Sequence, residues 1–180
     1  MFFEKAGPEN TEETARLAVK RAHELNIKNL VVASNTGKTA EFFLEKDLKV
    51  VCVTHQIGFR NPGEDEMSHS KRKEFQEKGI QLLTTTHLMG GVGRAVRKRH
   101  GGLYPGEILA DSLRILGQGV KVGLEIAVMA LDAGLIPYGQ DIVAVGGTGR
   151  GADTALVVEP EHSQHIFDSK IKEVICKPKK

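Results

Sequence analysis

The sequence has little of several residue types that mark particular classes of protein. Its 180 residues include no tryptophan and two cysteines, and aromatic residues make up 5% of the chain. Two cysteines are too few for the disulfide framework of a small secreted domain. Because Cys52 and Cys176 both lie in strand-like segments, we expect them to be small buried residues in a reducing compartment.

Long apolar runs and an excess of one charge are also missing. The first residues contain no apolar run of the length that a signal peptide needs. The most apolar stretch, residues 120–137, is interrupted by three charged residues, which argues against a membrane span. The formal net charge of +2 requires neither a nucleic-acid nor a membrane partner. We therefore expect a cytoplasmic protein that binds neither nucleic acid nor membrane, and homo-oligomerisation stays open.

Alternating sequence patterns predict one α/β domain over residues 1–180. The hydrophobic content of 40% and the charged content of 27% are typical of a soluble globular protein. Apolar segments suited to buried parallel strands alternate with segments of helical periodicity. The predicted strands are residues 30–33, 49–54, 80–84, 141–145 and 154–158. The predicted helices begin near Asn10 (a capping box with Glu13), Ala40, Ser68, Pro105 and Gly119.

A polar loop, Ser34-Asn35-Thr36-Gly37-Lys38-Thr39, follows the first predicted strand. Five of its six side chains can donate a hydrogen bond, whereas a helix N-cap needs one such residue. The backbone N–H groups of the loop and the dipole of the helix expected after it favour an anion, usually a phosphate. Position 32 is Val where a Walker A loop needs Gly. The pattern is similar instead to the phosphate loop of flavodoxin-like proteins, which holds the phosphate of FMN.

Three further loops leave the carboxyl ends of predicted strands. Residues 55–63 form either a ligand-facing loop or a plain surface loop. The threonine- and glycine-rich segment 84–94 leads into a basic run, Arg94–Arg99, without the interleaved aromatic residues typical of nucleic-acid binding. This run is either solvated or gives a single arginine to an anionic ligand. Residues 146–153 include four glycines, which favours a ligand-facing loop over a bare turn.

These loops supply the predicted ligand-binding residues. They are Ser34, Asn35, Thr36, Gly37, Lys38, Thr39, His55, Gly58, Phe59, Thr86, Gly90, Gly91, Gly147, Thr148, Gly149, Arg150 and Asp153.

Candidates for catalytic or metal-binding groups are few. Glu125 is either a lone catalytic carboxylate or the partner of Lys121, one turn earlier in the same predicted helix. His162 and His165 lie three positions apart, without further ligands at metal-binding spacing. We therefore predict no metal site and assign no catalytic residue.

Most of the chain, from Thr11 to Val158, resembles the C-terminal α/β domain of pyruvate kinase. The strand with its polar loop resembles the start of that domain, and Gly139–Val145 with the glycine-rich loop and last strand resembles its end. The resemblance implies a three-layer sandwich around a mostly parallel five-stranded sheet. It implies the strand order third, second, first, fourth, fifth, with the last strand antiparallel. The catalytic barrel of pyruvate kinase is absent, so the chain looks like a member of a stand-alone family found in archaea and some bacteria.

The same resemblance implies a function. In pyruvate kinases whose effector is a sugar bisphosphate, the first loop holds one phosphate and the last glycine-rich loop closes on the effector. By position these are residues 34–39 and 146–153. Both loops lie at the point where the chain reverses its direction across the sheet, where open α/β sheets bind ligands. We expect a protein without pyruvate kinase activity that binds a phosphorylated small molecule, best FMN. The alternatives are an enzyme acting on, or a regulatory sensor of, a sugar phosphate or nucleotide.

Overall fold

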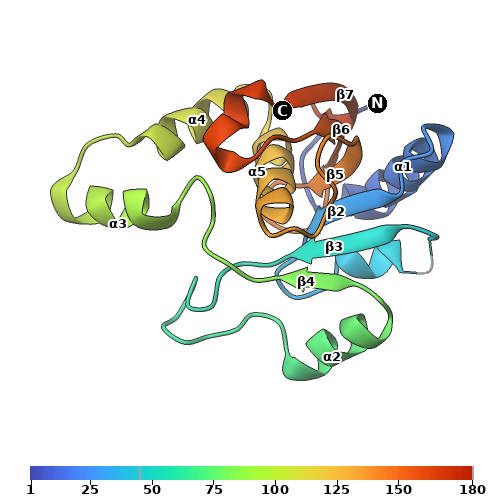
Figure 1. The fold of residues 1–180 in the computed structure, drawn as a ribbon, viewed down its shortest axis with the longest axis horizontal. Coiled ribbons are helices and arrows are strands. Elements are labelled where there is room, and N and C mark those ends of the chain that lie inside the picture. Colours follow the sequence, from blue (N-terminus) through green and yellow to red (C-terminus); the bar gives the residue numbers. More distant parts are fainter. Residues whose placement is uncertain (45, 180) are drawn as a thin grey trace.

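The computed structural model describes residues 1–44 and 46–179 and shows a sheet with helices on both faces (Figure 1). The strands are β1 (Phe2–Phe3), β2 (Asn29–Ala33), β3 (Lys49–Val53), β4 (Gln81–Leu83), β5 (Ile142–Gly146), β6 (Thr154–Glu159) and β7 (Lys170–Pro178). The α-helices are α1 (Thr11–Glu24), α2 (His69–Glu77), α3 (Gly91–His100), α4 (Pro105–Arg114) and α5 (Gln118–Asp132). Short 3₁₀ turns are η1 (Pro8–Asn10), η2 (Ala40–Phe43) and η3 (Ser163–Asp168).

The strand order is β1-β7-β6-β5-β2-β3-β4. The five predicted strands appear in it in the predicted order, with β2, β3, β4 and β5 parallel and β6 antiparallel to β5. The predicted count of five strands is wrong, because β7 pairs antiparallel with β6 and β1 pairs parallel with β7. A two-residue strand such as β1 has too few residues for an alternating pattern. The sequence predicts a strand-like segment around Cys176 but no pairing partner for it.

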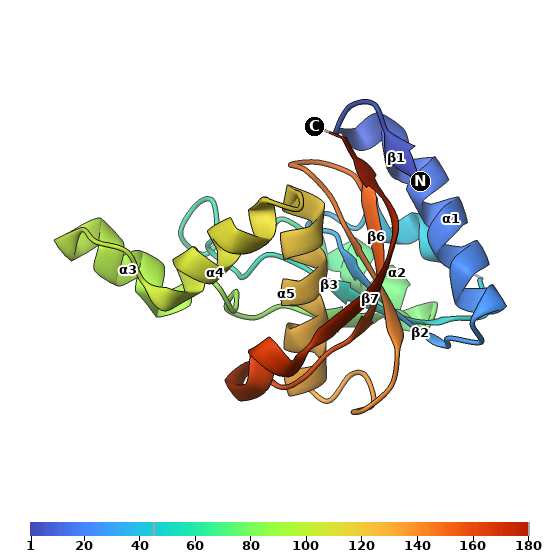
Figure 2. The same cartoon turned by 90° about the horizontal axis from the view of Figure 1, so that it is seen from above.

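Two apolar cores, one on each face of the sheet, confirm the three-layer sandwich (Figure 2). On one face, α1, η2 and α2 bury Ala18, Phe43 and Phe75 against strands β2 and β3. Each fully buried phenylalanine contributes about 1.5–3 kcal/mol relative to an exposed one. On the other face, α5 packs against β2, β5 and β6 and buries twelve of its fifteen residues.

Close approach of α5 to the sheet depends on three positions without a side chain. A Cβ atom at Gly119 would lie 2.1 Å from Oγ1 of Thr154, and one at Gly123 would lie 2.8 Å from Cδ1 of Leu156. A Cβ at Gly146, on β5, would lie 2.7 Å from the carbonyl oxygen of Gly119. These glycines fix the depth at which the first turns of α5 sit over the carboxyl ends of the strands.

Several local predictions fail. The helix expected after the polar loop is the single 3₁₀ turn η2, and Leu44 after it is already extended. The loop therefore has no α-helix dipole behind it. Asn10 does not form a capping box, because its side chain donates to the carbonyl oxygen of Lys5 at 2.8 Å. Helix α3 was not predicted, since its glycines and basic residues give no apolar stripe.

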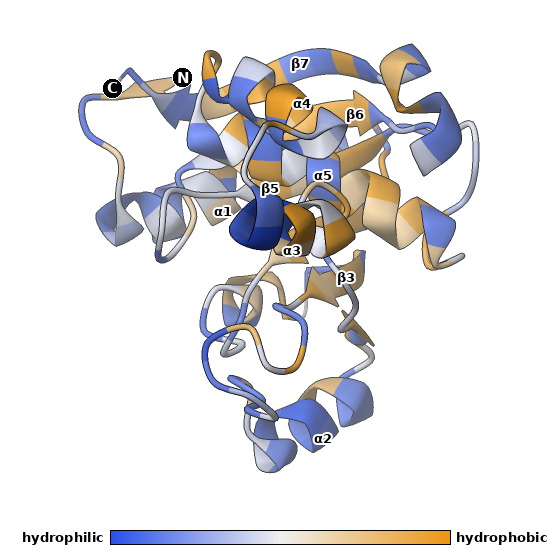
Figure 3. Ribbon diagram, turned by 90° about the vertical axis from the view of Figure 1, so that its left-hand side faces the viewer, coloured by the Kyte–Doolittle hydropathy of each residue, from blue (hydrophilic) through white to orange (hydrophobic). Residues whose placement is uncertain are grey.

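Other local predictions are confirmed. Ser68 caps α2 by accepting a hydrogen bond from the backbone N–H of Lys71 at 3.2 Å. Helix α2 is hydrophilic along most of its length (Figure 3), and Phe75 is its one buried residue. Cys52 and Cys176 are buried thiols without a disulfide. Among the described helices, none combines the length and the apolar character needed to cross a bilayer.

Candidate functional site

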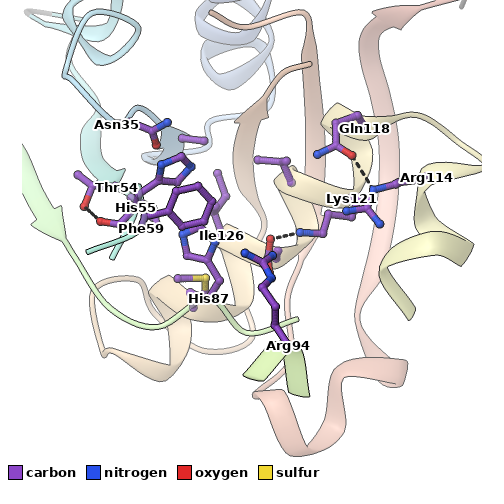
Figure 4. Close-up of a pocket in the computed structure, with 15 residues that line it drawn as sticks. Asn35, Thr54, His55, Phe59, His87, Arg94, Arg114, Gln118, Lys121 and Ile126 are labelled. Carbon is purple, nitrogen blue, oxygen red and sulfur yellow. Dashed lines mark hydrogen bonds and ion pairs between the residues drawn. The ribbon is translucent and has the colours of Figure 1, made fainter. Parts of the chain in front are cut away.

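A cavity of about 180 Å³ lies at the carboxyl ends of β2 and β3, between these strands and helix α5 (Figure 4). Its residues come from the two strand ends, the segments after β3 and β4, and helices α3, α4 and α5. They are Ala33, Asn35, Val53, Thr54, His55, Phe59, His87, Arg94, Arg114, Gln118, Lys121, Val122, Glu125, Ile126 and Met129.

One wall of the cavity is made of three neighbouring rings, two stacked and one tilted. The rings of His55 and Phe59 are stacked with centroids 3.8 Å apart and an interplanar angle of 24°. The ring of His87 lies 5.2 Å from that of His55 and 5.4 Å from that of Phe59. The guanidinium of Arg94 lies over Phe59, with its carbon atom 5.8 Å from the ring centre. Loop 55–63 and the segment after β4 therefore meet at one place, as parallel strands dictate.

His55 is held by a carboxylate that the sequence analysis did not identify. Its Nδ1 atom is hydrogen-bonded to Oε2 of Glu66. The other carboxylate oxygen of Glu66 pairs with Nε of Arg60 at 2.7 Å, and the Glu66 side chain is only 10% exposed. Eleven positions separate His55 from Glu66, a distance along the chain that no local pattern links.

The backbone next to His55 is fixed by a polar chain from α2. The hydroxyls of Thr54 and Thr84 are 2.6 Å apart, and Nη2 of Arg72 donates to Oγ1 of Thr84 at 3.0 Å. Nε of Arg72 also donates to Asp65 at 2.7 Å, and this bond holds the pKa of Asp65 below its usual value. This chain ties α2, β3 and the segment after β4 together beneath the three rings.

The opposite wall is a buried ion pair on α5. Lys121 Nζ donates to Oε2 of Glu125, and both side chains are nearly inaccessible. Of the two alternatives for Glu125, the pairing with Lys121 is therefore confirmed. Oε1 of Glu125 accepts a hydrogen bond from the backbone N–H of Met89 at 2.9 Å. Glu125 thus anchors the segment that carries His87.

Burial sets the protonation of His87. Desolvation lowers its pKa, the carboxylate of Glu125 opposes this, and the neighbouring His55 ring and the cations Lys121 and Arg94 lower it further. At neutral pH the His87 imidazole is therefore uncharged.

Two arginines complete the mouth of the cavity. Arg94 comes from α3, and Arg114, from α4, donates through Nε to Oε1 of Gln118 at 2.8 Å. With Lys121, three cationic side chains line the cavity against one carboxylate, Glu125. Their excess positive charge favours an anionic ligand.

The polar loop borders this cavity at Asn35. Oγ of Ser34, which is buried, accepts hydrogen bonds from the backbone N–H groups of Thr39 at 3.1 Å and Ala40 at 3.4 Å. Gly37 has φ +93°, and a Cβ there would lie 3.1 Å from the ring of Phe75. Within residues 1–44 and 46–179, the backbone N–H groups of positions 35–38 donate to no protein acceptor. The loop is thus folded by Ser34 and keeps a run of free donors.

The glycine-rich loop between β5 and β6 packs against other parts of the chain. Asp153 is fully buried, and its Oδ2 accepts from the backbone N–H groups of Gly7 at 3.3 Å and Thr148 at 3.1 Å. A Cβ at Gly151 would lie 2.7 Å from Cα of Pro8. A Cβ at Gly147 would lie 2.5 Å from the carbonyl oxygen of Gly151. The loop therefore packs against the N-terminal segment and itself, and its residues do not line the cavity.

The structure brings some of the predicted site residues together and leaves others apart. Asn35, His55 and Phe59 line the cavity. Gly58, Thr86, Gly90 and Gly91 lie in the segments that carry its rings and Arg94, and a Cβ at Gly90 would be 3.3 Å from Nη2 of Arg94. The polar loop buries Ser34, Gly37 and Thr39 and exposes Thr36 and Lys38. The separate hairpin between β5 and β6 carries the remaining predicted residues, Gly147, Thr148, Gly149, Arg150 and Asp153.

Sequence analysis did not identify Arg114 and Gln118 as cavity residues, and it named Lys121 only as the possible partner of Glu125. These residues lie on α4 and α5, whose pattern gives the apolar face but not the polar residues at its border. His87 lies in a segment that was singled out for its threonines and glycines. A histidine directly between them was the one signal that could have identified it.

The chain is similar to one known protein family and to several solved structures. The profile of the family described as pyruvate kinase, alpha/beta domain, matches residues 12–158. A solved pyruvate kinase from Cryptosporidium parvum is 15% identical, with a TM-score of 0.42, over 82% of this chain and 22% of that chain. A Cryptosporidium parvum pyruvate kinase in complex with ADP is 16% identical, with a TM-score of 0.41, over 82% of this chain and 22% of that chain. The chain therefore spans about a fifth of the length of these enzymes.

Proposed function

The chain belongs to the pyruvate kinase alpha/beta domain family, and we propose that it binds a phosphorylated small molecule, with the phosphate on the polar loop and the remainder in the adjoining cavity. FMN is the specific ligand that we propose first. Because the 180 residues contain no segment resembling the catalytic barrel, we also propose that this chain has no pyruvate kinase turnover of its own.

The observation that carries the proposal is the run of backbone N–H groups at positions 35–38, which have no acceptor within the described residues. Successive free N–H groups around a residue with positive φ, here Gly37, form the kind of concavity that binds anions without a helix dipole. The exposed side chains of Thr36 and Lys38 add a hydroxyl and a charge at the same place. Since Ser34 already holds the loop in shape, a phosphate binds without a large ordering cost.

The cavity supports a ligand with a flat or polar body. Its ring wall offers Phe59, which is 36% exposed, as a stacking surface. Its volume of about 180 Å³ is below the roughly 300–1,000 Å³ typical of ligand pockets. A ligand as large as FMN therefore fits only with its phosphate outside the cavity on the polar loop. A sugar phosphate is smaller than FMN and fits more completely into the cavity, so it is the alternative ligand to FMN.

Binding assays with matched ligands test the proposal. A visible spectrum of the purified protein shows whether flavin is present, and titration with FMN, riboflavin and a sugar phosphate ranks the ligands. Because each charge-assisted hydrogen bond contributes about 1.5–3 kcal/mol, we expect riboflavin, which lacks the phosphate, to bind at least tenfold more weakly than FMN. Equal affinity for both, or no binding of any phosphorylated ligand, would refute the proposal.

A further inference from the structure

We propose that the cavity is an acid–base catalytic site in which His55, positioned by Glu66, takes a proton from a carbon atom beside the carbonyl of a small phosphorylated substrate, while His87 donates a hydrogen bond to the carbonyl oxygen. This proposal rests on the proposed function, since the substrate is the phosphorylated ligand bound at the same site. It adds a reaction to a site for which the sequence supplied only binding residues.

The orientation of His55 is the first observation. Its Nδ1 is bonded to Glu66, its ring is stacked on Phe59, and its backbone neighbour Thr54 is anchored to Thr84. Both oxygens of Glu66 are engaged, one by His55 and one by Arg60. An ionised carboxylate accepts a hydrogen bond from Nδ1–H and so leaves Nε2 with its lone pair. Nε2 has no partner within the described residues, and the ring lines the cavity, so this nitrogen is a base available to a ligand.

The contrast between the two histidines is the second observation. Their rings are 5.2 Å apart and both line the cavity (Figure 4). His55 has a carboxylate on one ring nitrogen, whereas the imidazole of His87 has no direct hydrogen-bond partner within the described residues. The charged groups that face His87 are Glu125 and Lys121 from α5, Arg94 from α3 and His55 itself, and burial keeps its imidazole neutral. Paired titratable groups in contrasting environments are the arrangement expected of an acid and a base.

The surrounding charges suit the intermediate. Removing a proton beside a carbonyl places negative charge on the carbonyl oxygen, and Arg94 and Lys121 line the same small cavity. Lys121 and Glu125 are already paired and buried, so this wall does not need to reorganise when the charge develops.

The step balances without a co-reactant. The C–H proton moves to Nε2 of His55, and the C–H electron pair forms a carbon–carbon double bond. The π pair of the carbonyl moves onto its oxygen, which accepts a hydrogen bond from His87. The proton on Nε2 exchanges with solvent, so that a solvent proton returned from Nε2 to the same carbon labels the substrate. Where that carbon carries a hydroxyl, the hydroxyl proton moves to the enolate oxygen and the proton on Nε2 is delivered to the former carbonyl carbon, which interconverts a hydroxyaldehyde and a hydroxyketone. Nothing is oxidised or reduced overall.

Proton exchange in heavy water tests this directly. Dihydroxyacetone phosphate, glyceraldehyde 3-phosphate, ribose 5-phosphate and fructose 6-phosphate are each incubated with the intact protein in D₂O. Deuterium incorporation at the carbon beside the carbonyl is followed by NMR, and binding of the same probes is measured by calorimetry. We expect at least one probe to bind and to exchange above a buffer control, and the exchange to fall by 10²–10⁴-fold in His55→Gln. His165→Gln, an exposed histidine of η3 outside the cavity, is the matched control and keeps the exchange rate.

Glu66 is a positioning residue, and two variants separate positioning from packing. In Glu66→Gln the amide favours the other tautomer of His55, so Nε2 no longer accepts a proton; we expect loss of exchange and an altered pH–rate profile. Glu66→Asp keeps the charge and restores part of the rate. Thermal unfolding of all variants identifies any that fail to fold. The pH–rate profile of the unaltered protein is a second test that needs no variant: we expect the exchange rate to fall in acid, where His55 is protonated and cannot act as a base.

Distinct outcomes separate the two proposals. A probe that binds but does not exchange above buffer overturns the catalytic proposal and leaves the binding function intact. Exchange that persists in His55→Gln overturns it as well. If none of the four probes binds or exchanges, this reaction class is wrong, and FMN binding alone decides the proposed function.

Discussion

Glu125 accepts a hydrogen bond from the backbone N–H of Met89 at 2.9 Å while its other carboxylate oxygen receives the ammonium of Lys121. One buried carboxylate thereby joins α5 to the segment that follows β4. The cavity has a defined shape because this bond fixes two of its walls relative to each other.

We expect Glu125→Ala to destabilise the protein strongly. Removing one partner of a buried ion pair leaves the other charge buried and typically costs about 3–5 kcal/mol. The double variant Lys121→Met/Glu125→Leu removes both charges and should recover much of that loss. Urea denaturation measures the free energies of unfolding, and a loss below about 1 kcal/mol in Glu125→Ala contradicts this interpretation of the pair.

The glycines of α5 give a second prediction. Gly119→Ala places a methyl group 2.1 Å from Oγ1 of Thr154, so α5 must move off the sheet, at a cost of roughly 1–3 kcal/mol or more. Gly93, in the exposed helix α3, is the matched control: its Cβ would lie 3.5 Å from Tyr104. Gly93→Ala should be neutral or stabilise by up to about 1 kcal/mol through helix propensity. Equal effects of the two changes on the free energy of unfolding would show that α5 does not need its close approach.

The buried thiol Cys52 makes stability depend on alkaline pH. Burial raises its pKa from 9.0 to about 12, so the unfolded chain releases this proton more easily than the folded one. The contribution is complete below pH 9 and is lost as the pH rises toward 12, with a slope of up to about 1.4 kcal/mol per pH unit. Cys52→Ala should remove this part of the alkaline slope in denaturation curves measured between pH 8 and pH 11. If the alkaline slope of the free energy of unfolding is unchanged in Cys52→Ala, the slope does not come from the Cys52 thiol.

The glycine-rich hairpin should respond as a structural element. Asp153→Ala leaves the N–H groups of Gly7 and Thr148 without their acceptor, and the unsatisfied donor of Gly7, which is buried, costs about 1–3 kcal/mol. Arg150→Ala, on the exposed tip of the same hairpin, should leave the midpoint of thermal unfolding within a degree or two. If Arg150→Ala instead weakens binding of a phosphorylated ligand, the hairpin belongs to the site as the sequence suggested.

The parts of the fold differ in how well the sequence predicts them, because different interactions determine each part. Runs such as Val50–Val53 reveal buried parallel strands because both faces must be apolar, whereas the order of the five predicted strands was implied by the resemblance to the pyruvate kinase domain. Strand β7 could not be assigned to the sheet from its pattern, because its charged residues alternate with apolar ones at a half-exposed position. The polar loop was found from its hydroxyls and glycine. The expected helix dipole was wrong, because the segment forms one 3₁₀ turn whose Phe43 is buried in the core, and Leu44 after it is extended.

Composition does not distinguish two uses of glycine at the glycine-rich hairpin, and it does not show how the side chains of the cavity pair with one another. Glycines are required both where a ligand approaches and where the chain packs against itself, and the contact between Gly151 and Pro8 is of the second kind. The pairing of His55 with Glu66 and the meeting of Arg94 with Phe59 depend on how loops fold onto each other. Such contacts between loops leave no periodicity in the sequence.

The free N–H groups at positions 35–38 are the basis of the proposed function, and NMR gives a separate signal for each of these amides. Titration of ¹⁵N-labelled protein with FMN, riboflavin and inorganic phosphate follows the amide signals of Asn35, Thr36, Gly37 and Lys38. We expect these signals to move with FMN and with phosphate, and to stay within error with riboflavin at the same concentration. Signals that move equally with riboflavin, or that stay fixed while those of residues 146–153 move, would contradict phosphate binding at this loop.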